Sequence, residues 1–279
     1  MRQTTLFVQA IALALLAGGP ALAADLFPDK NLESAVRKYV FAKRDNKQPL
    51  TEEDVRSIST IVAKDAKIAS LAGLEKCAGL ALLDLAGNQV ADLNPIKELK
   101  LLQSLDLSRN QIADLKPLVG LAELQYLQLA DNQISDLAPI GGLTKLTSLY
   151  LSNNKVKDLT PIKGLTKLWS LYLDGNQAGD LAPIAGLKNL SSLDLRGNGV
   201  ADLAPLAGLS ELRYLFLDNN KVADLGVLVE MAKKDAAKEK RFAPYWRIYL
   251  TGNPLGEPAK TTQIADLKKL GGRITFEAK

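Results

Sequence analysis

Histidine is absent from this sequence of 279 residues, and cysteine occurs only once. Without histidine the chain has no Ser-His-Asp or Cys-His catalytic set, and it lacks the commonest ligand of zinc and iron. With Cys77 alone it cannot form a disulfide within one chain. No phosphate-binding glycine loop occurs, and the 35 basic residues nearly balance the 31 acidic ones. We therefore expect no cofactor, no nucleic-acid partner and no enzymatic activity.

Asparagine, in contrast, recurs with constant spacing. It returns every 22 residues, at Asn88, Asn110, Asn132, Asn154, Asn176, Asn198 and Asn220. Leucines precede each asparagine at fixed distances, as Leu80, Leu83 and Leu85 precede Asn88. This pattern is the signature of leucine-rich repeats, in which one short unit is stacked on itself. Leucines at alternate positions predict a short strand in each repeat, with all strands parallel.

Two polar columns accompany the leucines. A buried asparagine needs hydrogen-bond partners, so we predict that each one binds the backbone of neighbouring coils. An aspartate column precedes mostly Leu-x-Pro, which predicts that the carboxylate accepts a backbone N–H where a convex helical turn begins; it comprises Asp92, Asp114, Asp136, Asp158, Asp180, Asp202 and Asp224. Stacked about 5 Å apart, these carboxylates are alternatively a calcium ladder.

The two ends of the chain differ from the repeats. Residues 1–23 have the charge, the apolar core and the Ala-Leu-Ala ending of a signal peptide. We expect an exported protein, periplasmic or secreted, without stable membrane insertion. Residues 24–57 are predicted to form a helical N-terminal cap, in which Thr51 begins a second helix with Asp54 in its first turn. Residues 58–225 hold the repeats, of which the first is degenerate.

The last repeat is displaced by an insertion. Asn253 follows Asn220 by 33 residues rather than 22, and the eleven extra residues fall around Val227 to Arg241. Apolar residues followed by lysines predict a helix with a solvated basic side, with a polyanion contact as the alternative. Residues 226–279 thus contain the inserted helix, the last repeat and a helix-containing C-terminal cap. In this alignment Tyr245 takes the place of an inward leucine.

The chain resembles bacterial leucine-rich-repeat proteins of the internalin-like type. The resemblance rests on the 22-residue unit, with Gly-Asn-Gln and then Asp-Leu-Ala-Pro-Ile between Gly175 and Ile184, and on the start at Phe27-Pro28-Asp29. It implies an α/β solenoid, a right-handed leucine-rich-repeat coil with a parallel concave β-sheet. It implies no particular partner, because such proteins range from adhesins to secreted binders. We expect a monomer.

The concave face of such a coil is where a partner is expected. Five of the seven tyrosines and both tryptophans map to this face in a chain with 5% aromatic residues. Aromatic side chains mixed with Arg and Asp are typical of protein interfaces. We predict that an unknown protein or peptide binds there through Tyr126, Tyr150, Trp169, Tyr172, Asp194, Tyr214, Phe216, Trp246 and Tyr249, with Tyr150, Trp169 and Tyr172 at the centre.

Other interpretations of this face stay open. Tyr150 and Tyr172 would also stack on each other and simply stabilise adjacent strands. Aromatic faces also stack on sugars, so carbohydrate or cell-wall binding is the alternative function. Asp84 and Asp106 would be neighbours, as a glycoside hydrolase requires of its two carboxylates. Elsewhere the repeat register places Cys77 in a leucine column of the core, and Ala178 in a column of larger aliphatic residues.

Overall fold

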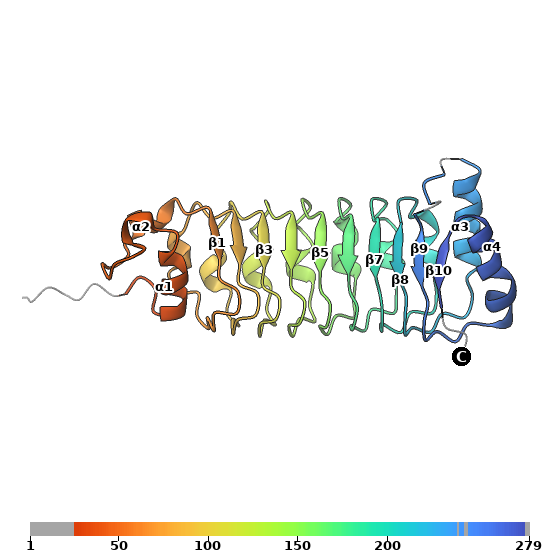
Figure 1. Ribbon diagram of the computed structural model, residues 1–279, viewed down its shortest axis with the longest axis horizontal. Coiled ribbons are helices and arrows are strands. Elements are labelled where there is room, and N and C mark those ends of the chain that lie inside the picture. The colour runs from red at the N-terminus through yellow and green to blue at the C-terminus, as the bar shows by residue number, and fades with distance from the viewer. Residues whose placement is uncertain (1–24, 239, 243–244, 277–279) are drawn as a thin grey trace, which may run out of the picture.

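A single parallel sheet runs the length of the protein. The computed structural model describes residues 25–238, 240–242 and 245–276, so the predicted signal peptide lies outside the described residues. Within them the sheet has ten strands in sequence order: β1 (Thr60–Val62), β2 (Leu82–Asp84), β3 (Ser104–Asp106), β4 (Tyr126–Gln128), β5 (Ser148–Tyr150), β6 (Ser170–Tyr172), β7 (Ser192–Asp194), β8 (Tyr214–Phe216), β9 (Arg247–Tyr249) and β10 (Arg273–Thr275). Figure 1 shows the strands as one row along an elongated solenoid. The predicted parallel leucine-rich-repeat solenoid is confirmed.

Short helical turns lie on the side of the coil away from the sheet. They are 3-10 helices: η2 (Leu74–Lys76), η3 (Asn94–Ile96), η4 (Lys116–Leu118), η5 (Ala138–Ile140), η6 (Thr160–Gly164), η7 (Ala182–Ile184) and η8 (Ala204–Gly208). The predicted role of the aspartate column is confirmed, since Oδ1 of Asp136 accepts the N–H of Ala138 at 2.8 Å and the other six aspartates bond in the same way. In the described part of the chain no group of three or more acidic or cysteine side chains is placed to hold a metal ion.

The asparagine column forms the predicted ladder. The amide of Asn132 donates to the carbonyl oxygens of Leu107 and Leu129, both at 3.0 Å, and its Oδ1 accepts the N–H of Ile112 at 2.9 Å. The leucines of each coil are buried beside it. Each asparagine therefore connects its own coil to the preceding one through backbone atoms that have left the strand, which satisfies polar groups that the apolar interior would otherwise leave unpaired.

Helices cover the first strand. α1 (Lys30–Arg37), η1 (Phe41–Lys43) and α2 (Glu52–Arg56) precede β1, and α2 begins with the predicted capping box of Thr51 and Asp54. The outer edge of β1 is also blocked by a side chain: the N–H of Val62 donates to the Tyr39 hydroxyl at 2.8 Å. An unpaired strand edge invites pairing with another chain, so this contact protects the end of the sheet.

At the other end, the insertion forms the predicted helix. α3 (Gly226–Ala236) buries Leu228, Val229 and Met231, while β9 is followed by the π-helix η9 (Ala259–Gln263), α4 (Ile264–Lys269) and β10. The final strand, β10, pairs with β9 and closes the sheet. Figure 1 shows α3 and α4 packed together at this end of the solenoid. No helix in the described ranges is long and apolar enough to cross a membrane.

Cys77 lies in the core, as its register predicts. Its side chain is fully buried, and burial raises the pKa of the thiol to about 12. A thiol with such a pKa stays protonated near neutral pH, so it is a poor nucleophile. Cys77 is therefore a structural residue in a column of leucines.

Candidate functional site

The sheet places the predicted tyrosines and Phe216 in two columns, and each tryptophan lies one residue before a strand. Residues 22 positions apart are paired in register through β8, and the insertion then aligns Tyr214 with Arg247 and Phe216 with Tyr249. Side chains on either side of each central leucine point to the concave face, because alternate residues of a strand face opposite ways. Strand geometry therefore gathers residues that are far apart in the sequence onto one surface.

Three tyrosines form a continuous stack on this surface. The ring centroids of Tyr126 and Tyr150 are 5.4 Å apart, and those of Tyr150 and Tyr172 are 5.0 Å apart. All three side chains are half-buried. Burial, with a further contribution from Asp106, raises the pKa of Tyr126 to about 12. The stacking that we considered from the sequence is thus present, and it accounts for part of the aromatic enrichment without any partner.

Asp194 follows the stack, but it does not face solvent. Its carboxylate is buried and bonds the guanidinium of Arg196, with Nη2 and Oδ2 separated by 2.6 Å. Arg196 also lies over the ring of Phe216, at 5.5 Å from the centroid. Burial raises the pKa of Asp194 against the opposing effect of Arg196. The prediction that Asp194 is exposed to a partner is wrong, because the taller side chains of adjacent strands and Arg196 cover this short one.

Trp246 is the second correction. It is 1% exposed and stacks on Phe242 with ring centroids 4.3 Å apart, whereas Tyr245 is 62% exposed. The sequence alignment had placed Tyr245 inward and Trp246 on the surface. The inserted segment enters β9 differently from the other repeats, so the inward side chain before Ile248 is the tryptophan.

The exposed aromatic residues surround an open hollow of about 490 Å³ on the concave side. We call it the aromatic hollow; its lining includes Trp169, Tyr172, Tyr214, Phe216, Tyr245 and Arg213. Trp169 is 61% exposed and Tyr214 38%. A second open hollow of about 420 Å³ adjoins it and shares Trp169, Ser191 and Arg213. The structure therefore brings Trp169, Tyr172, Tyr214 and Phe216 of the predicted site together. It adds Tyr245, which the sequence analysis missed.

The remaining predicted residues lie on either side of the aromatic hollow. Tyr126 and Tyr150 continue the stack toward the N-terminus, and Tyr249 stacks on Phe216 with ring centroids 4.7 Å apart. Asp84 and Asp106 are neighbours, as predicted, but they lie on β2 and β3. Asp84 pairs with Lys64 at 3.0 Å. The two carboxylates thus lie several strands away from the aromatic hollow.

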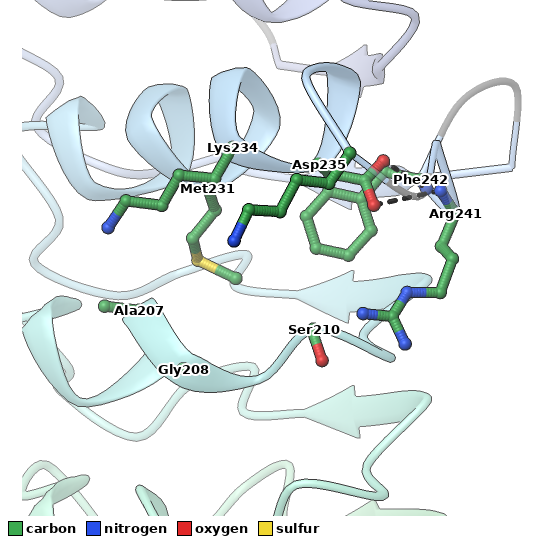
Figure 2. Close-up of a pocket in the computed structure, with 9 residues that line it drawn as sticks. Ala207, Gly208, Ser210, Met231, Lys234, Asp235, Arg241 and Phe242 are labelled. Atoms are coloured by element: carbon green, nitrogen blue, oxygen red, sulfur yellow. Dashed lines mark hydrogen bonds between the residues drawn. The ribbon is translucent and has the colours of Figure 1, made fainter.

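A further pocket of about 230 Å³ lies between α3 and the turn at η8. Figure 2 shows Met231 extending from α3 toward the coil that carries Ala207, and Asp235 directed toward Arg241 and Phe242. Two of its charged residues have internal partners: Asp235 accepts the N–H groups of Arg241 and Phe242, and Arg241 pairs with Glu211. These contacts fasten the inserted segment to the solenoid, so this pocket has a structural explanation.

Comparison with known proteins agrees with this architecture. The family model for leucine-rich repeats in two copies matches residues 79–120, 100–142, 122–164, 144–186 and 188–230, which together make up more than half of the chain. The chain is an internalin-like leucine-rich-repeat protein. No curated protein sequence matches the chain.

Several solved structures resemble this internalin-like protein. An internalin (inlF) from Listeria monocytogenes has 29% identity and a TM-score of 0.79, with 95% of this chain and 75% of that one aligned. Internalin C2 (inlC2) from the same organism has 32% identity and a TM-score of 0.71 over 74% and 91% of the two chains. The leucine-rich-repeat protein LIC12759 from Leptospira interrogans has 25% identity and a TM-score of 0.64, covering 75% and 57%.

Proposed function

We propose that this internalin-like protein is an exported, non-enzymatic binding protein that holds a protein partner on its concave face. The observation that carries the proposal is the exposure of Trp169, Tyr214 and Tyr245 around the aromatic hollow. Stacking accounts for the half-buried tyrosines of β4 to β6, but these three exposed side chains take no part in that stack. Exposed apolar side chains gathered around a hollow are typical of binding sites.

The size of the sheet supports a macromolecular partner. Ten strands leave nine intervals of about 4.8 Å, so the concave face is about 43 Å long. A face of this length accommodates a protein domain or an extended peptide. The sequence signals for export come from residues 1–23, and leucine-rich-repeat proteins of this type commonly act in protein–protein interaction.

Affinity capture with three baits tests the proposal. The baits are the mature chain, a Trp169→Ala/Tyr245→Ala variant, and a Val119→Ala control. Val119 is 60% exposed and follows η4, on the side away from the sheet. We expect a protein that is captured by the mature chain and the control but not by the double variant, with the same melting midpoint for all three. The same proteins on all three baits would overturn the proposal.

Carbohydrate binding is the second candidate. The hollow that adjoins the aromatic hollow combines the exposed ring of Trp169 with the polar side chains of Thr147, Asn189 and Ser191. An aromatic face beside hydrogen-bonding groups is an arrangement that suits a sugar ring. Binding of the mature chain to a glycan array that disappears in Trp169→Ala would favour this function over a protein partner. An array without such signals would eliminate it.

A further inference from the structure

The charges around the aromatic hollow are unbalanced. Lys167 and Arg213 line the adjoining hollow, and neither side chain forms an ion pair within the described residues. The one acidic residue of that lining, Glu211, is neutralised by Arg241. The buried carboxylate of Asp194 is likewise paired with Arg196. The surroundings of Trp169 therefore carry positive charge that the protein itself does not compensate.

The strands beyond the aromatic hollow add to this excess. Arg247 and Arg273 lie directly opposite each other in β9 and β10, and both are exposed. The guanidinium of Arg247 is 5.8 Å from the centroid of the Tyr214 ring, which places it beside the aromatic hollow. Like charges directly opposite in a sheet destabilise it. Within the described residues, neither arginine has an ion pair.

The opposite end of the sheet provides an internal comparison. Asp84 and Asp106 are also like charges directly opposite each other, on β2 and β3. There, however, Lys64 pairs with Asp84 at 3.0 Å, and Asp106 accepts the N–H of Ser108 at 2.9 Å. The charge of the acidic pair is thus compensated within the protein, whereas no carboxylate of the described residues pairs with Arg247 or Arg273.

We infer that the partner contributes an extended acidic segment, in which an aromatic or large aliphatic side chain enters the aromatic hollow and adjacent carboxylates bind Arg213, Arg247 and Arg273. This inference rests on the proposed function and specifies its ligand. Carboxylates match arginine because the guanidinium presents two parallel N–H donors. Apolar contact at Trp169 and Tyr245 supplies the anchor, while the surrounding charges select the partner and speed its approach.

The geometry fixes the length of the segment. From β6 to β10 there are four intervals of about 4.8 Å, or about 19 Å. An extended chain advances about 3.3 Å per residue, so a segment of about six or seven residues spans the aromatic hollow and the paired arginines. A displayed library of random peptides about seven residues long is therefore a suitable probe, because it requires no knowledge of the natural partner.

The library is selected on the mature chain and on three variants. Trp169→Ala removes the anchor, and Arg247→Glu/Arg273→Glu reverses the charge of the basic pair. The matched control is Lys116→Glu/Lys163→Glu, which changes the same charge on exposed lysines of η4 and η6, away from the sheet. Melting midpoints of all variants establish that each one is folded.

We expect the mature chain and the control to enrich peptides with Asp or Glu beside an aromatic or large aliphatic residue. The Arg247→Glu/Arg273→Glu variant should bind these peptides about tenfold more weakly and should select Lys or Arg instead. Selection without an acidic preference, or a preference that survives the charge reversal, would overturn the inference. Peptides that depend on Trp169 but show no such preference would overturn the inference alone. Peptides that bind Trp169→Ala and Arg247→Glu/Arg273→Glu as tightly as the mature chain would overturn the proposed function as well.

Discussion

The ladder makes a quantitative prediction at Asn132, in the middle of the solenoid. Asn132 is 8% exposed, and replacing it with alanine removes bonds to four backbone partners, the carbonyls of Leu107, Leu129 and Ala130 and the N–H of Ile112. The carbonyl of Ala130 keeps the bond from the N–H of Arg109. The partners are not equally affected. The carbonyl of Leu107 keeps a bond from Asn110, and that of Leu129 keeps one from Asn154, because each carbonyl accepts from two successive asparagines. Only the N–H of Ile112 is left without its acceptor.

The loss can be estimated from these contacts. An orphaned buried N–H costs about 1–3 kcal/mol, and a shared hydrogen bond contributes about 1 kcal/mol in net terms. We therefore expect Asn132→Ala to lower the free energy of unfolding by about 2–4 kcal/mol. A larger loss of stability would be expected if all four backbone partners were left unpaired, so a value in this range is a specific consequence of the shared carbonyls.

Aspartate at the same position should behave differently. It keeps the acceptor for Ile112, but its second oxygen faces the carbonyl oxygens of Leu107 and Leu129, which are also acceptors. This arrangement and the burial favour the protonated acid, so the folded-state pKa of the new carboxyl lies above its unfolded value of about 3.9. The folded state then binds more protons, and stability falls as pH rises from about 4 through the folded pKa. Each pKa unit adds about 1.4 kcal/mol to the loss at higher pH.

Urea denaturation followed by circular dichroism at pH 4.5 and pH 7.5 measures both effects. The midpoints are compared with those of the unchanged chain and of Gln133→Ala, which alters the exposed neighbour of Asn132. We expect Asn132→Asp to lose more stability at pH 7.5 than at pH 4.5, relative to the unchanged chain, and Asn132→Ala to lose the same amount at both. The reasoning would be refuted if the stability loss of Asn132→Asp did not depend on pH, or if Asn132→Ala were as stable as Gln133→Ala.

Three further predictions concern other parts of the solenoid. Ala178→Ile should raise the free energy of unfolding by about 1 kcal/mol, because Ala178 occupies a buried column otherwise filled by valine and isoleucine. An unchanged unfolding midpoint would mean that neighbouring side chains already fill the space. Tyr39→Phe should lower the free energy of unfolding by about 1 kcal/mol, because it removes the acceptor for the N–H of Val62. Sedimentation should then detect concentration-dependent association at the exposed edge of β1. Cys77 should resist a thiol reagent in the native protein and react fully in denaturant. Cys77→Ser should lower the free energy of unfolding, measured by urea denaturation, by about 1–3 kcal/mol, because the buried hydroxyl lies in a column of leucines that offers it no hydrogen-bond partner.

The repeat explains how far sequence reasoning reached. A period of 22 residues assigns every position to a column, and the contacts of one coil are repeated in the next, so one interpretation of Asn88 or Asp92 applies to all its equivalents. The ladder, the aspartate turns and the buried Cys77 were predictable for this reason, because each depends on nearest-neighbour contacts that the period determines. The capping box at Thr51 precedes the repeats and was predictable from its local residue spacing.

The candidate site was less predictable because it lies where the period fails. After the eleven-residue insertion the strand is re-entered in a different way, which exchanged the predicted environments of Tyr245 and Trp246. The burial of Asp194 depends on the relative heights of side chains in adjacent strands, and a column assignment does not contain this information. The aromatic hollow itself is formed by side chains from four consecutive coils, so its shape emerges only from the assembled structure.

The ladder also determines which residues are available for binding. The backbone groups that leave each strand are satisfied by the asparagine and aspartate columns and, in some coils, by an outward side chain such as Asp84 or Gln128. The outward tyrosines and the paired arginines of β9 and β10 make no such backbone bond among the described residues. Stacked tyrosines are stabilising at such positions, whereas adjacent arginines are not. The uncompensated pair of Arg247 and Arg273 therefore opposes stability, in contrast to the compensated pair of Asp84 and Asp106. Residues that oppose stability are expected where a surface is selected for binding, and the arginine pair lies beside the exposed aromatic residues.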